Sequence, residues 1–240
     1  MDANAACDGK CRCRIIAFLE SSIGKKITVA LAGVLLCGFL LAHLVGNLFL
    51  FSGEAAFNHY AELLMENPLL PAAEIGLVFL FLMHIALSVR ATWLNRAARP
   101  EGYVVYRSKG ARTPGSRTMA ATGALLLVFL AVHVGTFKYQ VGGSKGSDLF
   151  AHVSGWFANP VYALFYILAL GGLGLHLSHG AQSALQTFGL NHPRYTPALK
   201  KAGLAFAALV FLGFASMPLY FGFIHKAGGA CCTTSSGGAK

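Results

Sequence analysis

Histidine is the residue type in this sequence whose placement points to chemistry. Nine histidines occur, and five of them fall inside long apolar stretches: His43, His84, His133, His176 and His179. An ionisable side chain at membrane depth is costly, so it usually faces the interior of a helix bundle and has a function. A single buried histidine is as often a packing residue. Four consecutive apolar stretches that each carry one indicate a site.

The depths of these histidines group them in two pairs. His43 lies 17 residues after Lys26, and His133 lies 16 residues after Arg117. At about 1.5 Å per residue, both lie roughly 25 Å from the basic rim. His84 and His176 belong to stretches that run the other way, and they lie nearer to that rim. The sequence therefore predicts an outer pair, His43 with His133, and an inner pair, His84 with His176.

Two facing imidazoles at one level can bind the iron of a porphyrin from both sides. Zinc and copper sites instead need three or four ligands that converge on one point, with thiolates or carboxylates often among them. Gly172 and Gly180 flank His176 at a spacing of four and would leave room for a flat ring, although glycines also serve helix packing. Two haems with both axial positions filled indicate electron transfer rather than oxygen binding.

The elements that must position these histidines are transmembrane helices. The chain has 240 residues, of which 55% are hydrophobic and 12% charged, with a mean hydropathy of +0.59. Soluble domains carry about 25% charged residues. Five segments reach the length of about 20 residues that a bilayer requires; they are 27–51, 71–94, 119–137, 161–185 and 202–224. The sequence therefore predicts an all-α integral membrane protein whose first four helices form a haem-binding bundle.

The net charge of +10 is a topology signal rather than a sign of nucleic-acid binding. Of the 19 Lys and Arg residues, 15 lie in the N-terminal segment, the second-to-third loop and the fourth-to-fifth loop. The positive-inside rule then places the N-terminus in the cytoplasm and the C-terminus outside. We expect flexible tails at 1–20 and 226–240 around a transmembrane domain at 21–225. We expect no cleaved signal peptide, because the first apolar run is too long for one.

Two sets of short motifs lie in and beside the first and fourth predicted spans. The run HLSHGAQSALQTFG occupies 176–189, and SIGKK at 22–26 is followed by AHLVGNL at 42–48. They resemble the fourth and first spans of the large diheme membrane-anchor subunit of succinate:quinone oxidoreductases and fumarate reductases. The resemblance covers about residues 20–224, and its specificity lies in the order and spacing of the motifs.

This resemblance implies a subunit of the bacterial cytoplasmic membrane that binds menaquinone and two b haems. His43 with His133 would ligate the distal haem, and His84 with His176 the proximal one. His179 is the alternative to His176, but the family places its ligand four residues before a glycine, which favours His176 over His179. A flavoprotein subunit and an iron–sulfur subunit would dock on the cytoplasmic side. The chain itself has no flavin or iron–sulfur motif, so the dicarboxylate chemistry would lie in these partners, and a higher oligomer of the complex is left open.

One position departs from the family. Some fumarate-reducing members carry an acidic residue two positions before the fourth ligand, thought to assist proton movement, and here that position is Gly174. The direction of the reaction, succinate oxidation or fumarate reduction, therefore stays open.

Quinone and propionate contacts are predicted at the two rims. Ser22 and Lys25 are candidates for bonding a quinone carbonyl near the cytoplasm, although Ser22 would serve equally as a helix cap and Lys25 as a headgroup anchor. Candidates for proton exchange with a quinone at the outer face are His59, Tyr60, Glu62 and Glu66. An ordinary acidic surface loop would explain these residues equally well. Candidates for the proximal propionates are Arg90, Trp93, Arg107, Arg117 and His179, the first four of which membrane anchoring explains equally well.

Two other functions compete with this one. The cytochrome b anchor of a hydrogenase or formate dehydrogenase would also be a diheme helical bundle. A transporter with histidine proton relays would need interrupted helices at mid-membrane, for which only Pro218 gives a hint. Cys7, Cys11 and Cys13 are closely spaced but lack the further ligands of a metal site, so we expect free thiols in a tail.

Overall fold

Five long helices dominate the computed structural model of the chain, which describes residues 14–98, 113–140 and 148–225. They are α2 (Ser22–Leu48), α4 (Leu70–Ala97), α5 (Pro114–Phe137), α7 (Pro160–Thr187) and α8 (Thr196–Leu219). Within the described residues, these are the five helices long and apolar enough to cross a membrane, α2 and α8 with their short continuations η1 (Phe49–Ser52) and η2 (Tyr220–Ile224). The predicted all-α membrane fold with five spans is confirmed.

Polar side chains just before the spans define where three of them begin. Ser21 accepts the backbone N–H of Gly24 at 2.9 Å and caps α2, so the neighbouring Ser22 is not the cap. Thr113 caps α5 and Asn159 caps α7 through the same kind of bond. Each of the latter two is followed directly by a proline, whose missing N–H costs nothing in the first turn.

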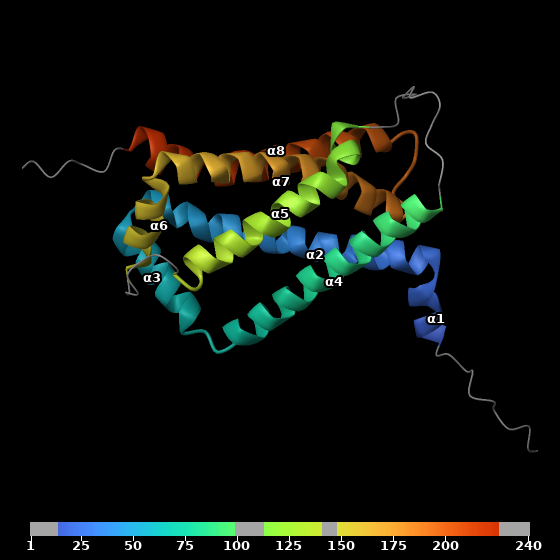
Figure 1. Cartoon of the computed structure of the whole chain (residues 1–240), viewed down its shortest axis with the longest axis horizontal. Helices are drawn as coiled ribbons and strands as arrows, with labels where there is room; N and C mark the ends of the chain where they lie inside the picture. The colour runs from blue at the N-terminus through green and yellow to red at the C-terminus, as the bar shows by residue number, and fades with distance from the viewer. Residues whose placement is uncertain (1–13, 99–112, 141–147, 226–240) are drawn as a thin grey trace, which may run out of the picture.

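Consecutive long helices run antiparallel, so the segments that connect them lie at the two ends of the bundle (Figure 1). The short α1 (Arg14–Glu20) lies at one end, together with the end of α4 and the start of α5. The helices α3 (Glu54–Met65) and α6 (Leu149–Phe157) lie at the other. Among the described residues, most of the lysines and arginines lie at or near the first end. We call it the basic end and the opposite one the outer end.

The first four spans carry the histidines, and the fifth packs against them, with the ring centre of Phe214 5.6 Å from that of His43. α7 packs against α5, α2 and α8, while α4 packs chiefly against α2. None of the α4 residues is buried, and apolar side chains cover its outward surface, as expected for a helix that meets lipid. α8 adds Val210 and Phe214 to the interior beside α7. The arrangement leaves α4 as the least enclosed wall of the bundle.

Three segments differ from the sequence-based expectations. Residues 14–20, expected in a flexible tail, form the helix α1, and two connections expected as loops form α3 and α6. Gly53, with φ of +96°, allows the sharp reversal from the end of the first span into α3. Asn58 of α3 then joins α6 by donating to Asp148 and accepting the backbone N–H of Phe150, each at 2.9 Å. The cysteines at 7, 11 and 13 lie outside the described residues.

The stability of the outer end depends on pH through the carboxylate of Asp148. Its carboxylate accepts the N–H of Ala151 at 2.8 Å as the cap of α6, and this bond, followed by the one from Asn58, lowers the pKa of Asp148. Because the pKa of Asp148 is lower in the folded than in the unfolded protein, its ionised carboxylate stabilises the fold above about pH 4. This contribution to the free energy of unfolding is lost as the pH falls through the lower pKa of the folded state. We expect amide protection in α6, corrected for intrinsic exchange, to fall below about pH 4 in hydrogen-exchange mass spectrometry.

Asp148→Asn is the matched control for this prediction. Asparagine caps helices about as well as aspartate, but its amide does not titrate in this range. The variant should keep α6 protected at neutral pH and lose the acid-dependent weakening. An unchanged pH profile in Asp148→Asn would show that another group controls this end of the molecule.

Candidate functional site

The outer pair of histidines meets across the bundle. The ring centres of His43 on α2 and His133 on α5 lie 5.8 Å apart, with the ring planes at 88°. Phe39 stacks on His43 at 5.3 Å, and Phe129 stacks on His133 at 5.6 Å. Both histidines are half-buried. Aromatic rings one turn before each histidine therefore fill the space along its helix.

The inner pair meets in the same way, nearer to the basic end. The ring centres of His84 on α4 and His176 on α7 lie 6.5 Å apart, at 68°. Each ring rests against a glycine of a neighbouring helix. A methyl group on Gly33 of α2 would lie 3.5 Å from Cε1 of His84, and one on Gly123 of α5 would lie 3.7 Å from Cε1 of His176. Larger side chains at these glycines would compete with the imidazoles for space.

The structure brings together the same pairs that the depths in the sequence predicted. Two imidazoles that bind one metal ion from opposite sides, at about 2 Å each, have ring centres about 6 Å apart. The observed separations of 5.8 and 6.5 Å are of this size. The spacing of both pairs therefore fits a metal bound between the rings, and the role of these residues as ligands stays a prediction.

All four histidines have a polar neighbour, and that of His84 is the backbone of Val29 on α2. His176 Nδ1 lies 3.2 Å from Thr122 Oγ1 on α5, and His133 Nδ1 lies 3.2 Å from the Tyr166 hydroxyl on α7. The amide of Asn47 lies 3.3 Å from His43 Nδ1 on its own helix. Nδ1 of His84 is buried without a hydrogen-bond partner among the described residues. An unpaired buried nitrogen costs free energy unless a further group binds there.

A cavity of about 540 Å³ opens between α2 and α4 at the outer end. Phe39 lines it from α2, and its ring separates the cavity from His43. Most of the α4 residues that line it lie on the face of that helix that carries His84; the lining on α4 comprises Leu70, Ala73, Glu74, Gly76, Leu77, Phe79 and Leu80. Glu74 pairs with Lys138 at the end of α5. The volume falls in the range of about 300–1,000 Å³ that is usual for ligand and cofactor sites.

The alternative ligand His179 lies one turn beyond His176, beside the first turn of α5. A methyl group on Gly115 of that turn would lie 3.1 Å from Cβ of His179. The ring in contact with His84 is that of His176, and no ring contact of His179 occurs within the described residues. The geometry therefore favours His176 over His179 as the partner of His84.

The three glycines near His176 have different surroundings. Gly172 packs against α5, because a methyl group there would come within 2.6 Å of Leu125. Gly174 faces α8, where a methyl group would lie 3.3 Å from Cβ of Phe211. Gly180 has open space beside it. Of the two roles that the sequence leaves open for Gly172, the structure shows helix packing, against Leu125 of α5.

The predicted rim residues lie mostly on the surface. Ser22, Arg90, Trp93 and Arg117 are exposed and Lys25 is half-buried, all toward the basic end; Arg107 lies outside the described residues. At the outer end, His59, Glu62 and Glu66 are exposed along α3. Tyr60 differs from them, because its ring stacks on Phe49 at 4.9 Å and its hydroxyl lies against Gly46. Tyr60 therefore seats α3 on the end of α2.

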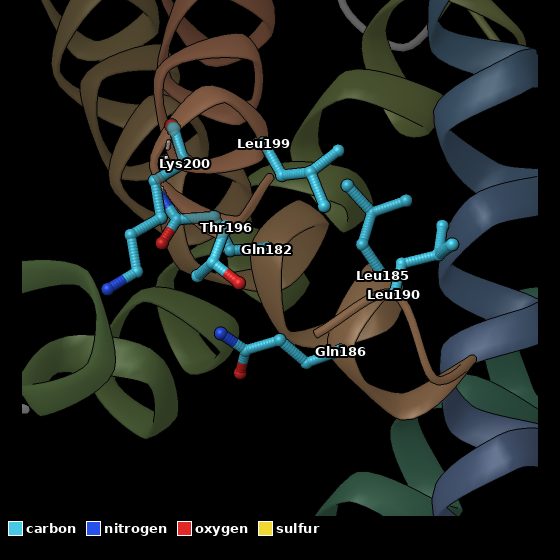
Figure 2. Close-up of a pocket in the computed structure, with 7 residues that line it drawn as sticks. All are labelled: Gln182, Leu185, Gln186, Leu190, Thr196, Leu199 and Lys200. Carbon is cyan, nitrogen blue, oxygen red and sulfur yellow. Dashed lines mark hydrogen bonds between the residues drawn. The ribbon is translucent and has the colours of Figure 1, made fainter. Parts of the chain in front are cut away.

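A second, much smaller pocket lies where α7 and α8 meet at the basic end. Figure 2 shows its lining, which includes Gln182, Gln186 and Lys200. Gln182 donates to the carbonyl oxygen of Lys200 at 3.5 Å. The pocket holds about 10 Å³, which is about the space of one water molecule. It cannot accept a quinone ring.

Comparison with known proteins gives two matches. The sequence pattern of the family described as "succinate dehydrogenase/fumarate reductase transmembrane subunit" matches residues 95–215, half of the chain. The succinate dehydrogenase cytochrome b558 subunit of Bacillus subtilis (strain 168) is 27% identical over 208 residues, which is 81% of this chain and 94% of that protein. No solved structure gives a significant match.

Proposed function

Because this chain belongs to the family of succinate dehydrogenase and fumarate reductase transmembrane subunits, we propose that it carries electrons between an iron–sulfur subunit and menaquinone by way of two b haems. The chain is the membrane anchor of such an oxidoreductase complex. Family membership favours this function over the hydrogenase anchor and the transporter.

The single observation that best supports the haem proposal is the pairing of four histidines from four spans at two levels. In this proposal, His43 and His133 hold the outer haem, and His84 and His176 hold the inner one. The Bacillus relative is named as a cytochrome b558, which supports b haem as the group bound. A b haem with two axial ligands supplies a one-electron carrier with no open coordination position.

The chain's own residues would do three things for this function. The imidazoles fix the positions of the metals, and Phe39 and Phe129 keep water from the outer pair. The helices set the two levels, one nearer the basic end and one nearer the outer end. An apolar surround of this kind also controls solvent access and hence the redox potential. The pairs thus form a two-step route across the bilayer.

The basic end is the proposed docking side for the flavoprotein and iron–sulfur subunits. By the positive-inside rule this end faces the cytoplasm of a bacterium, with the N-terminus inside and the C-terminus outside. Arg90, Trp93 and Arg117 lie toward this end and are exposed; together with His179, they are proposed to serve the inner propionates. The match to 95–215 includes the second-to-third connection, which carries several of the basic residues.

Two regions remain candidates for menaquinone. Ser22 and Lys25 have side chains without hydrogen-bond partners among the described residues, near the docking side. At the outer end, His59, Glu62 and Glu66 expose groups that can exchange protons with water. The exposure of these carboxylates favours the outer end for proton exchange, whichever direction the reaction runs.

Purification of the intact complex from its native membrane tests the proposal. We expect a flavoprotein and an iron–sulfur protein to co-purify with the chain, together with succinate-dependent reduction of a menaquinone analogue. A partner that contains nickel or molybdenum would contradict the proposal and favour the hydrogenase or formate dehydrogenase anchor.

A further inference from the structure

Thr122 is a buried hydroxyl inside the bundle that the histidine pairs do not explain. Its side chain is only 6% exposed, on the face of α5 that meets α7. Its Oγ1 lies 3.2 Å from Nδ1 of His176, a residue 54 positions away in the sequence. The contact therefore joins two helices at the level of the inner pair.

The direction of this hydrogen bond follows from the other contacts of the hydroxyl. Thr122 Oγ1 lies 2.9 Å from the carbonyl oxygen of Thr118 and 3.2 Å from that of Met119. The Thr118 carbonyl, which only accepts, is the nearest of the three partners, and this favours donation of the one hydroxyl proton of Thr122 to its own helix. The lone pairs of Oγ1 are left to accept. With the hydroxyl proton donated to its own helix, Nδ1 of His176 carries a proton and donates it to Oγ1, which leaves Nε2 as the nitrogen with a free lone pair.

We propose that Thr122 is a positioning residue that fixes the tautomer and orientation of His176, so that Nε2 of this residue is the nitrogen that binds the inner iron. The inference rests on the proposed function, since it concerns the inner haem. Histidine ligands commonly donate their second N–H to such a partner, which orients the ring and makes it a better electron donor. Thr122 also distinguishes His176 from His179, whose ring has no hydrogen-bond partner among the described residues.

The close approach of α5 and α7 brings the hydroxyl of Thr122 within hydrogen-bond distance of His176. Gly115 lies two turns before Thr122 on the same face of α5. A methyl group on Gly115 would come within 2.8 Å of the carbonyl oxygen of Leu175 and 2.7 Å of Ser178 Oγ. Only glycine therefore permits α5 to lie this near to α7 beside His176.

The other histidines lack an equivalent bond. Nδ1 of His84 has no partner among the described residues, and Asn47 touches His43 from the same helix. The Tyr166 hydroxyl lies 3.2 Å both from His133 Nδ1 and from the Tyr162 hydroxyl, so its donor and acceptor roles are not fixed by the geometry. The inner pair therefore combines one imidazole whose Nδ1 meets a side chain of α5 with one that bonds the backbone of Val29 and whose Nδ1 has no partner among the described residues.

Removal of the acceptor should favour the ferrous state of the inner haem. Without Thr122 Oγ1 the imidazole of His176 donates less charge, so it stabilises the ferric state less. In the purified complex with Thr122→Val, we expect the equilibrium of the inner haem to shift about three- to tenfold toward the ferrous form, where tenfold equals 59 mV for one electron. The ferric electron paramagnetic resonance signal of that haem should change, while the outer haem keeps its potential.

Two further variants make this test specific. Thr122→Ser restores the hydroxyl without the methyl group and should return the potential to the wild-type value. Thr92→Val on α4 removes a hydroxyl that bonds the Ser88 carbonyl at 2.9 Å and meets no imidazole, so it should leave both potentials unchanged. Loss of the inner haem from Thr122→Val with retention in Thr122→Ser would equally support the positioning role.

Two results would overturn the inference while leaving the proposed function intact. One is a wild-type potential and resonance signal for the inner haem in Thr122→Val. The other is an equal change in Thr122→Ser and Thr122→Val, which would show that the hydroxyl does not control the potential. A wild-type complex that contains no haem would instead refute the proposed function itself.

Discussion

Replacement of His176 by alanine is expected to remove the inner haem and to leave about one haem per chain. His84 then faces an empty position, and one neutral imidazole alone holds a b haem weakly because b haem has no covalent link to the protein. His176 is the residue whose ring lies 6.5 Å from that of His84. Haem content relative to protein, measured on the purified complex, checks this prediction.

His179→Ala is the matched control, because it removes a histidine from the same helix one turn away. We expect this variant to keep both haems, since the ring of His179 makes no contact with His84 in the described structure. The opposite pattern, in which His179→Ala loses a haem and His176→Ala keeps both, would assign the inner ligand to His179. Such a result would also remove the basis for the role of Thr122.

Replacement of His43 by alanine is expected to remove the outer haem and to uncouple the complex from its quinone. His43 and His133 face each other at 5.8 Å, so the loss of one leaves the other without a partner across the metal. If the outer haem lies between the partners and an outer quinone site, succinate-dependent reduction of a menaquinone analogue should fall at least about tenfold. Reduction of a soluble artificial acceptor by the partner subunits should continue, because that chemistry does not pass through this chain.

His152→Ala serves as the control for the outer pair. His152 lies near the same level on α6, but its Nε2 donates to the carbonyl oxygen of Thr136 at 2.9 Å, so it is already satisfied as a structural residue. This variant should keep both haems and most of the quinone reductase activity. Full activity and two haems in His43→Ala would contradict the assignment of the outer pair.

The sequence predicted the parts of the fold that depend on hydropathy and periodicity. Five spans follow from the length of each apolar run, and their antiparallel order follows from the basic residues at alternate connections. Because helix rise is constant, the distance of each histidine from the basic rim predicted which histidines share a level. The rings of His43 and His133, and of His84 and His176, lie together in the structure accordingly.

The contacts around the histidines could not be predicted in this way. Gly33 and Gly123 lie on neighbouring helices, and only the rotation and packing of those helices bring them against His84 and His176. Thr122 is one of several threonines in the spans, and its sequence context does not distinguish it. Gly172, four residues before His176, packs against Leu125 of α5, and the sequence alone does not distinguish this role from room for a ring.

The helices at the outer end were missed for a related reason. α3 and α6 have only 12 and 9 residues, too few to cross a membrane, so the sequence shows them only as connections between spans. Asn58 stabilises both by bonding Asp148 and the backbone of Phe150, about 90 residues away in the chain. Tertiary contacts of this kind leave no periodic signal in the sequence.

Haem stoichiometry of the wild-type complex tests the two-haem proposal most directly. Haem extracted from the purified complex and measured against the amount of this chain should give two b haems per chain, and a redox titration should resolve two separate one-electron steps. One haem per chain, or a chain that carries none, would contradict the proposal that the four paired histidines form two axial sites.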